Sequence, residues 1–504
     1  MTTARDTSGA PSLFGAAALL MTGRTIAFAA TFLTPVVLAR CFTPSEFGTY
    51  KQLFLVFATL FPVAQCGMAE SLFYFLPGAR DAAGRYVANS TALLTAAGLA
   101  TAALLLAGDG AIARWLGNPS LAEYMPLIAA FSLLMLASAG LEIAMTAQES
   151  YRRAATVYAI GDLVRGACLV APALVFRRLD LVLGGVVAYA GARFLLTLAY
   201  YRHVFGAALR LDGRRLAQQL AYGVPFGLAV VLEIAQANYH QYAVAHYFDA
   251  ATFAIYAVGC LQIPFVDFVA TSAGSVMMVR FAQARQDGRD DLALEIWRET
   301  TRKLALLFFP MVAVLLVCAR ELIVTLFTER YAGSVVVFQI SLATIALSSF
   351  ATDAVLRSYA RMRFLMSLYA VKLALVAVLV GPCLAAFGLP GAILATVAAL
   401  ALSKAVAVVR MARLFGCGAR ILPWRSLADI ARVAALAALA GFLVKWPLQD
   451  TPLAAFAAAA LVTGGVSVVL VLQWDLVSAD ERAALADWVR RTIGRAPETV
   501  ESGG

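Results

Sequence analysis

CFTPSEFGTYKQLF, from Cys41 to Phe54, and YFDAATFAIYAVGC, from Tyr247 to Cys260, each follow a long apolar stretch of the chain. The aromatic residues that recur between them at one constant offset are Phe42, Phe47 and Tyr50 in the first and Phe248, Phe253 and Tyr256 in the second. Duplication of this kind is common in membrane transporters, and it predicts two related halves of six helices each. Because six spans return a chain to the side where it began, the halves are predicted to be parallel repeats about an axis along the membrane normal.

The composition is that of a membrane protein. Hydrophobic residues make up 62% of the 504 residues and charged residues only 14%, and the mean hydropathy is +0.81. A soluble domain carries roughly 25% charged residues, so lipid rather than water is expected to surround most of this chain. A bilayer span needs about 20 apolar residues. The length therefore allows many spans joined by short loops, with little left for a separate soluble domain.

Apolar runs bounded by charges, Pro or Gly predict an all-α integral membrane protein of about fourteen transmembrane helices. The predicted spans are 11–39, 50–76, 87–108, 123–148, 154–176, 179–201, 219–248, 250–279, 301–328, 331–357, 363–387, 388–412, 427–446 and 452–474. The first is too long for the core of a signal peptide and is followed by many more spans, so we expect it to be retained.

Basic residues predict the orientation, because Lys and Arg gather in the short cytoplasmic loops of membrane proteins. Placing both termini in the cytoplasm puts most loop cations on the inner side, with Arg152, Arg214 and Arg420 among them. The same asymmetry accounts for the net charge of +10, and no motif typical of nucleic-acid binding accompanies it. We predict a multi-pass protein of the cell inner membrane, N-in and C-in.

The predicted spans divide the chain into five segments. They are a cytoplasmic N-terminus at 1–10, an N-lobe of six helices at 11–201, a C-lobe of six helices at 219–412, two further helices at 427–474 and a cytoplasmic amphipathic tail at 475–504. The tail and the segment Asp290–Lys303 place apolar residues on one face and charges on the other. This pattern predicts interfacial helices along the cytoplasmic membrane surface.

Charges deep within predicted spans are the first candidates for a binding site, because a charge in hydrocarbon is costly and normally faces protein or a hydrated cavity. The deepest cations include Arg24, Arg193 and Lys372. A guanidinium is a bidentate phosphate ligand, so Arg24 is a candidate for substrate capture; the alternative is a buried ion pair with a carboxylate. Asp162 and Arg165, three residues apart on one predicted helix, are expected to pair with each other.

The predicted seventh span carries a polar stripe. Glu233, Gln236 and His240 follow i, i+3, i+7 spacing on one helix face. Unsatisfied polar groups are costly in hydrocarbon, so this stripe is predicted to line a hydrated space and contact substrate. The alternative is a set of interhelical hydrogen bonds. Glu233 and Asp267 are the candidate carriers of a coupling ion.

Signatures of catalysis are missing from the sequence. It has no P-loop for ATP, no nucleophile elbow, and neither an H-E-x-x-H motif nor an aspartate-rich metal site. The seven cysteines are scattered without metal-ligand spacing. We therefore predict a transporter rather than an enzyme, with no cofactor and no metal.

LARCFTPSEFGTY at Leu38–Tyr50 and the glycine-bearing stretch Gln65–Phe75 resemble the matching segments of Wzx-type polysaccharide and oligosaccharide flippases. That family belongs to the multidrug/oligosaccharidyl-lipid/polysaccharide (MOP) exporter superfamily, and the resemblance covers nearly the whole chain. It implies a MATE-like V-shaped bundle whose two lobes alternate access. The implied substrate is an undecaprenyl-diphosphate-linked oligosaccharide for cell-surface polysaccharide biosynthesis, with Arg24, Arg193 and Lys372 as the candidate cations of the cavity.

Two other functions stay open at this point. A proton- or sodium-coupled drug or metabolite antiporter could use the same scaffold, and a membrane glycosyltransferase or polymerase forms a third class. Polymerases usually carry a large extracytoplasmic loop, whereas the outer loops predicted here are short. The sequence leaves open the sugar and whether the polymer is lipopolysaccharide or exopolysaccharide. We expect a monomer, acting alone or with other polysaccharide-assembly proteins.

Overall fold

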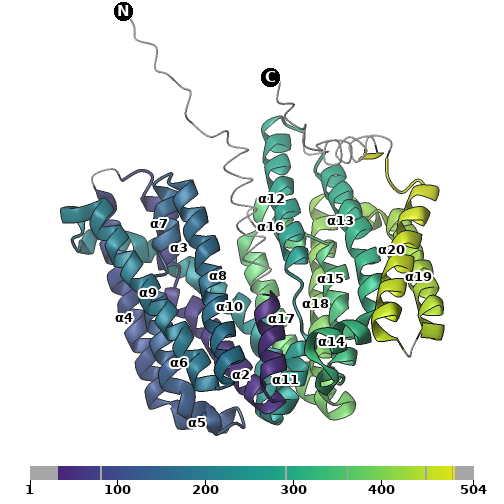
Figure 1. Ribbon diagram of the computed structural model, residues 1–504. Helices are drawn as coiled ribbons and strands as arrows, with labels where there is room; N and C mark the ends of the chain where they lie inside the picture. The colour runs from purple at the N-terminus through teal and green to yellow at the C-terminus, as the bar shows by residue number, and fades with distance from the viewer. Residues whose placement is uncertain are drawn as a thin grey trace, which may run out of the picture. The chain divides into compact units, whose positions relative to one another are not determined.

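The computed structural model describes residues 32–79, 82–289, 292–359, 361–448, 451–478 and 481–482. Every regular element in this part of the chain is a helix (Figure 1). Thirteen helical segments among these residues are long and apolar enough to cross a membrane, and they match the second to the fourteenth predicted spans. The predicted all-α membrane fold is confirmed. Most of the predicted first span, the predicted N-terminus at 1–10 and most of the predicted tail lie outside the described residues.

The chain forms two compact units. The first comprises the chain up to Phe268, Ile323–Ser341 and Tyr359–Ala407, and the second comprises Val269–Leu322, Leu342–Ser358 and the chain from Val408 onward. These bounds differ from the predicted lobes at 11–201 and 219–412, and the division into lobes stays a prediction.

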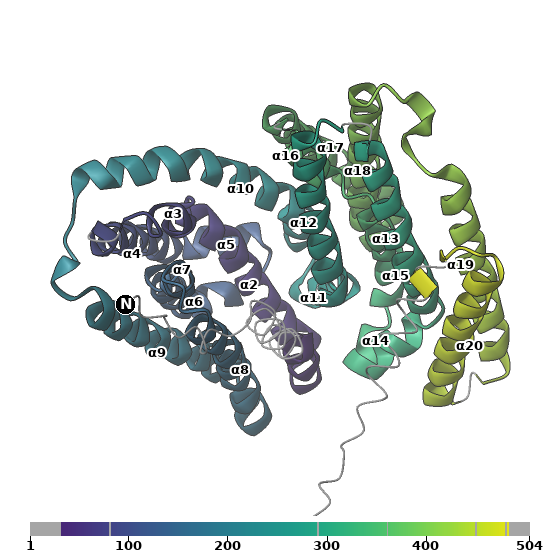
Figure 2. The same ribbon diagram turned by 90° about the horizontal axis from the view of Figure 1, so that it is seen from above.

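The first unit holds most of the helices. Those that lie wholly within it are α2 (Pro44–Gln65), α3 (Met68–Phe75), α4 (Ala83–Ala107), α5 (Asp109–Trp115), α6 (Ser120–Ala137), α7 (Leu141–Ala147), α8 (Tyr151–Phe176), α9 (Leu179–Phe205), α10 (Gly213–Tyr247), α11 (Ala250–Gly259) and α17 (Met362–Phe387), with the short 3-10 helices η2 (Gly206–Ala208) and η3 (Glu329–Tyr331). Helices α4, α6 and α9 lie side by side (Figure 1). The long helix α10 passes α3 and α4 (Figure 2) and also packs on α2, α11 and α17.

The second unit is built around three long helices. The helices wholly within it are α13 (Leu292–Val317), α16 (Thr352–Ser358), α19 (Trp424–Lys445) and α20 (Pro452–Gln473), with η4 (Gly418–Ile421) and η5 (Trp446–Leu448). The bounds of the two units fall within α12 (Pro264–Gln286), α14 (Ala319–Phe327), α15 (Ser334–Ser348) and α18 (Leu389–Leu414). Helices α13, α19 and α20 pack against one another (Figures 1 and 2).

Two predicted spans are interrupted in the structure. The span predicted at 50–76 is divided into α2 and α3, because Cys66 and Gly67 take left-handed backbone conformations with φ of 46° and 71°. A Cβ on Gly67 would lie 2.5 Å from the carbonyl oxygen of Gly223, so glycine here also permits the close approach of α10. The span predicted at 250–279 is divided into α11 and α12 by residues 260–263.

The prediction of a separate interfacial helix at Asp290–Lys303 is wrong. From Leu292 onward this segment is the first part of the continuous helix α13. The apolar side chains Ile296 and Trp297 are buried inside the protein. An amphipathic pattern requires only that one face of a helix be covered by something apolar, and here protein rather than lipid covers it.

The recurrent aromatic segments begin two helices that each have a side-chain N-cap at the equivalent position. Thr43 is the N-cap of α2: its hydroxyl accepts a hydrogen bond from the amide of Glu46, whose carboxylate accepts one from the amide of Thr43. Asp249 is the N-cap of α11 and accepts from the amide of Thr252, at the equivalent position. The two helices pack together. The predicted repeat is therefore present as a repeat of local structure.

Helices α2 and α11 approach each other most closely at Gly48. A Cβ on this residue would lie 1.8 Å from the backbone oxygen of Ala250. No flexible side chain can move aside there, because the atom that it would meet belongs to a backbone. The neighbouring Phe47 is fully buried, so the contact lies inside the packed part of the first unit.

Replacing Gly48 by Ala is expected to lower the free energy of unfolding by about 1–3 kcal/mol, because α2 and α11 must move apart to admit the methyl group. Thermal unfolding of the purified protein in detergent measures the loss. The matched control is Gly184→Ala in α9, where an added Cβ would meet no atom within 4 Å. Equal destabilisation in both variants would show that the contact at Gly48 has no special role.

Candidate functional site

A cavity in the first unit has an aromatic wall and a charged one. Its volume is about 300 Å³. The lining residues come from the segment before α2, from α2 itself, from α6 and from α8: Thr34, Pro35, Tyr50, Lys51, Phe54, Phe57, Ala58, Phe131, Asp162, Arg165, Gly166 and Leu169. An apolar cavity with a few convergent polar groups is the usual form of a small-molecule site. We therefore take it as the candidate site.

Three phenylalanines form the aromatic wall. The ring of Phe131 on α6 lies 5.9 Å from that of Phe54 and 4.7 Å from that of Phe57, measured between centroids. Tyr50 extends the row, with its ring 4.6 Å from that of Phe54. Rings packed in this way lose little conformational entropy when a ligand arrives, so they provide a rigid apolar surface.

Lys51 provides a cation without a carboxylate partner among the described residues. It lies on α2, one residue beyond Tyr50, and it lines the cavity. Its ammonium group lies 5.5 Å from the centroid of the Phe47 ring, a weak cation–π contact. No hydrogen bond or ion pair joins it to the part of the chain that the structure describes. Such an ammonium group can bind an anionic ligand without first breaking a salt bridge.

The predicted pairing of Asp162 with Arg165 is confirmed. Arg165 Nη2 lies 2.9 Å from Asp162 Oδ1 on the cavity side of α8. One turn of helix brings the two groups together, as their spacing predicts. The pair is neutral as a whole, so Lys51 supplies the excess positive charge among the cavity residues.

Arg193, one of the predicted substrate ligands, forms a bidentate ion pair with Glu142. Its two terminal nitrogens lie 2.5 and 2.6 Å from the two carboxylate oxygens, and its Nε lies 3.3 Å from the hydroxyl of Ser138. This ion pair joins α7 to α9, whereas the pair of Asp162 with Arg165 lies within α8.

Gln236 and His240, also predicted as ligands, lie one turn apart on α10, and Lys372 lies on α17, which packs against α10. Gln236 and His240 are buried. His240 Nδ1 lies 2.6 Å from the hydroxyl of Tyr256 on α11. The carbonyl oxygen of the Gln236 side chain is buried and has no hydrogen-bond partner among the described residues.

The other predicted site residues lie elsewhere. Glu233 is exposed although it shares the stripe with Gln236 and His240, and Asp267 is exposed in the first turn of α12. Arg24 lies outside the described residues. The structure therefore buries Gln236 and His240 together on α10, places Lys372 on the neighbouring helix α17, and pairs Arg193 with Glu142.

Sequence reasoning missed Lys51, because the second span was predicted to begin at Tyr50, which placed Lys51 at a helix end. The structure begins α2 at Pro44 and places Lys51 two turns into the helix. The signal that could have found it is the capping box, a Thr at position 43 followed by a Glu three residues later, with a Pro at the first helical position.

Glu142→Ala is expected to destabilise the protein by about 3–5 kcal/mol, because it leaves the Arg193 guanidinium without its carboxylate inside a span. The double variant Glu142→Leu with Arg193→Met should recover much of the loss. Protein abundance in membranes and thermal unfolding measure both. The matched control is Asp180→Ala, which removes the exposed partner of Arg178 and should cost at most about 1 kcal/mol. A double variant no more stable than Glu142→Ala would contradict this account.

The chain is similar in fold to transporters of known structure. A lipid II flippase, MurJ, in an inward closed conformation matches with a TM-score of 0.68 at 12% sequence identity, over 91% of this chain and 99% of that one. An inward-facing MATE family multidrug transporter of the MOP superfamily matches with a TM-score of 0.59 at 13% identity, over 79% and 98%. A MOP superfamily transporter from Pyrococcus furiosus matches with a TM-score of 0.55 at 13% identity, over 79% and 94%.

The sequence itself matches a family model. No curated protein sequence matches the chain significantly, whereas the model of the family described as polysaccharide biosynthesis protein matches residues 37–336. This range includes the helices of the cavity, α2, α6 and α8. The family match and the MOP-type fold confirm the resemblance to Wzx-type exporters, and this membrane protein belongs to the polysaccharide biosynthesis protein family.

Proposed function

We propose that the protein flips an undecaprenyl-diphosphate-linked oligosaccharide across the inner membrane by alternating access, for the assembly of a cell-surface polysaccharide. The family match and the similarity in fold to a lipid II flippase and to MATE transporters support this proposal. A diphosphate and a glycan need a polar path through the bilayer, whereas a polyprenyl tail can remain in lipid. The chain therefore has to shield only the head of such a substrate.

The proposal rests mainly on the unpaired charge of Lys51. This residue is a cation in a partly apolar cavity, and no carboxylate of the described residues neutralises it. A charge in a span is costly unless it serves a ligand or a partner. A diphosphate is an anionic ligand of the kind that a lysine ammonium group binds as a point charge. The aromatic wall of Phe54, Phe57 and Phe131 would hold the adjoining part of the substrate.

The predicted site residues take different roles in this proposal. His240 and Gln236 on α10 and Lys372 on α17 would contact the glycan or a phosphate, since Gln236 has an acceptor without a described partner. Arg193 would act by fixing α7 and α9 through Glu142, because that carboxylate already occupies both of its terminal nitrogens. Arg24 stays a proposed phosphate ligand on the strength of its place in the sequence.

Lys51→Met is expected to lower the rate of substrate flipping at least tenfold, which corresponds to about 1.4 kcal/mol lost from one charge-assisted contact. Lys51→Arg should keep most of the activity because it keeps the charge. Proteoliposomes that contain a fluorescent undecaprenyl-diphosphate oligosaccharide measure the rate at matched protein content. The matched control is Arg114→Met, which removes an exposed cation from the same unit.

A wild-type rate in Lys51→Met would contradict the proposed role of Lys51.

The proton- or sodium-coupled antiporter is the second candidate function, favoured by the exposed carboxylates Glu233 and Asp267, neither of which forms an ion pair with a described residue. An antiporter predicts that Glu233→Gln or Asp267→Asn abolishes transport driven by an ion gradient. It also predicts that the lipid-linked oligosaccharide is not moved.

We also propose the N-in, C-in orientation in the inner membrane. Cysteine labelling in intact cells tests it, with single cysteines placed at Arg210 and Phe387 in a background without native cysteines. The orientation puts residue 210 in the cytoplasm and residue 387 outside, so a membrane-impermeant maleimide should label only the second. Labelling of residue 210 from outside would reverse the topology.

A further inference from the structure

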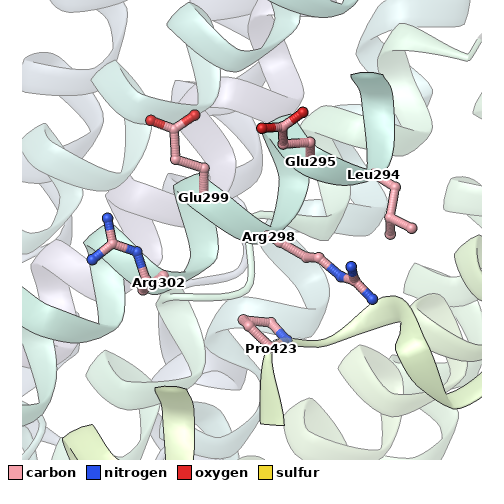
Figure 3. A pocket seen from close by; sticks show the side chains of 6 residues that line it. All are labelled: Leu294, Glu295, Arg298, Glu299, Arg302 and Pro423. Atoms are coloured by element: carbon pink, nitrogen blue, oxygen red, sulfur yellow. The ribbon is translucent and has the colours of Figure 1, made fainter. Parts of the chain in front are cut away.

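A second cavity lies in the second unit, where α13 and α19 both begin (Figure 3). Its volume is about 430 Å³, and it is lined by Leu294, Glu295, Arg298, Glu299, Arg302 and Pro423. Because both helices are long enough to span a membrane and start here, the cavity lies at the end of two neighbouring spans. Such a position corresponds to the membrane–water interface.

Two of the four charged lining residues already have partners. Glu299 accepts hydrogen bonds from Lys303 at 2.6 Å and from Arg280 at 3.1 Å. Arg302 donates to the carboxylate of Glu481 and to the carbonyl oxygen of Leu476, both at 2.6 Å. These two residues are therefore occupied in holding other parts of the second unit.

Arg298 is the cation that remains. It makes no hydrogen bond or ion pair with the residues that the structure describes, and its Nε is buried without a partner. In Figure 3 its guanidinium lies on the same side of α13 as Pro423, whereas the carboxylates of Glu295 and Glu299 point to the other side. A guanidinium with a buried unpaired donor needs an acceptor, because leaving it unpaired costs free energy.

The start of α19 supplies further unpaired donors. Its N-cap position is occupied by Pro423, which provides no side-chain acceptor. The backbone amides of Arg425 and Ser426 find no acceptor among the described residues. An uncapped helix N-terminus carries partial positive charge and is a ready site for an anion. Pro423, the residue just before this first turn, lines the cavity together with Arg298.

The surroundings indicate that the anion belongs to a membrane lipid. Trp424 is 60% exposed at the first position of α19, and its indole nitrogen donates to the carbonyl oxygen of Ala419 at 2.8 Å. A large exposed aromatic residue at the end of a span is typical of the interface. Arg420 and Arg425 beside it are exposed, and clustered cations there attract anionic headgroups.

We propose that this cavity binds the phosphate of an anionic phospholipid, held by the guanidinium of Arg298 and the first-turn amides of α19. The ligand is a lipid of the surrounding bilayer and not the transported substrate, so the site is separate from the cavity at Lys51. The phosphate caps α19 and neutralises Arg298. Binding therefore stabilises the packing of α13 against α19.

Titration of the full-length protein in detergent micelles with phosphatidylglycerol, followed by native mass spectrometry, tests the proposal. Wild-type protein is expected to retain one tightly bound phosphatidylglycerol. Arg298→Gln should weaken its apparent affinity about tenfold, the equivalent of one charge-assisted hydrogen bond. Arg298→Lys keeps the charge and should lose less. The matched control is Arg432→Gln on α19, an exposed arginine paired with Asp429, which should bind as the wild type does.

Two further binding experiments distinguish a lipid phosphate from a free phosphate ion. Phosphatidylcholine should bind more weakly, because its choline cation would lie beside Arg420 and Arg425. Inorganic phosphate alone, assayed by thermal unfolding, should give no stabilisation that depends on Arg298. If inorganic phosphate stabilised the protein in a way that depends on Arg298, the site would bind a free anion, and the proposal that its ligand is a lipid would be wrong. If the wild type and Arg298→Gln bound phosphatidylglycerol with equal affinity, the proposal of a binding site at Arg298 would be wrong.

Discussion

Hydrocarbon offers no hydrogen-bond partner to a backbone amide, a carbonyl group or a charged side chain, and this constraint organises the protein. The segment from Leu38 to Tyr50 shows how it is met. Arg40 donates from its Nε to the carbonyl oxygen of Leu326 at 2.8 Å, and also to that of Thr325, at the end of α14. The capping box of Thr43 and Glu46 satisfies amides at the start of α2. A short polar motif thus completes the hydrogen bonding of two helix ends.

The same constraint sorts the charged residues into two groups. Arg193 and Arg165 are neutralised within the protein by Glu142 and Asp162, so they stabilise the bundle and add no net charge to it. Lys51 has no such partner among the described residues, and Arg298 in the second unit has none either. A cation that the protein leaves unpaired at membrane depth or at the interface is available to an anionic ligand. Both proposed sites rest on this difference rather than on a count of basic residues.

The two proposed sites use phosphate in different ways. At Lys51 a single ammonium group lies beside aromatic rings, an arrangement that can hold a diphosphate and release it. In the proposed site at Arg298, a guanidinium and the amides of a helix start would hold the phosphate together. Amides fixed in a helix cannot move away from an anion, so this second arrangement suits a lipid that stays bound. Transport needs release, whereas structural support needs retention.

The sequence by itself determined the membrane class, the approximate positions of the second to the fourteenth spans and the local pair of Asp162 with Arg165. Each of these depends on residues that are close together in the chain. Hydropathy extends over a single span, and an i, i+3 pair is brought together by one helical turn. The repeat of Phe47 and Tyr50 could be seen for the same reason, because it begins two similar helices.

Only the tertiary structure decided which charges have partners. Glu142 and Arg193 meet across different helices, and no local pattern predicts how α7 and α9 are rotated toward each other. The orientation of α10 likewise leaves Glu233 exposed while it buries Gln236 and His240, although all three share one stripe. Sequence analysis did not select Lys51, because the first turns of α2 are polar and the hydropathy pattern therefore started the predicted span only at Tyr50. Side-chain contacts between helices depend on packing, and packing is settled by all the neighbours of a helix at once.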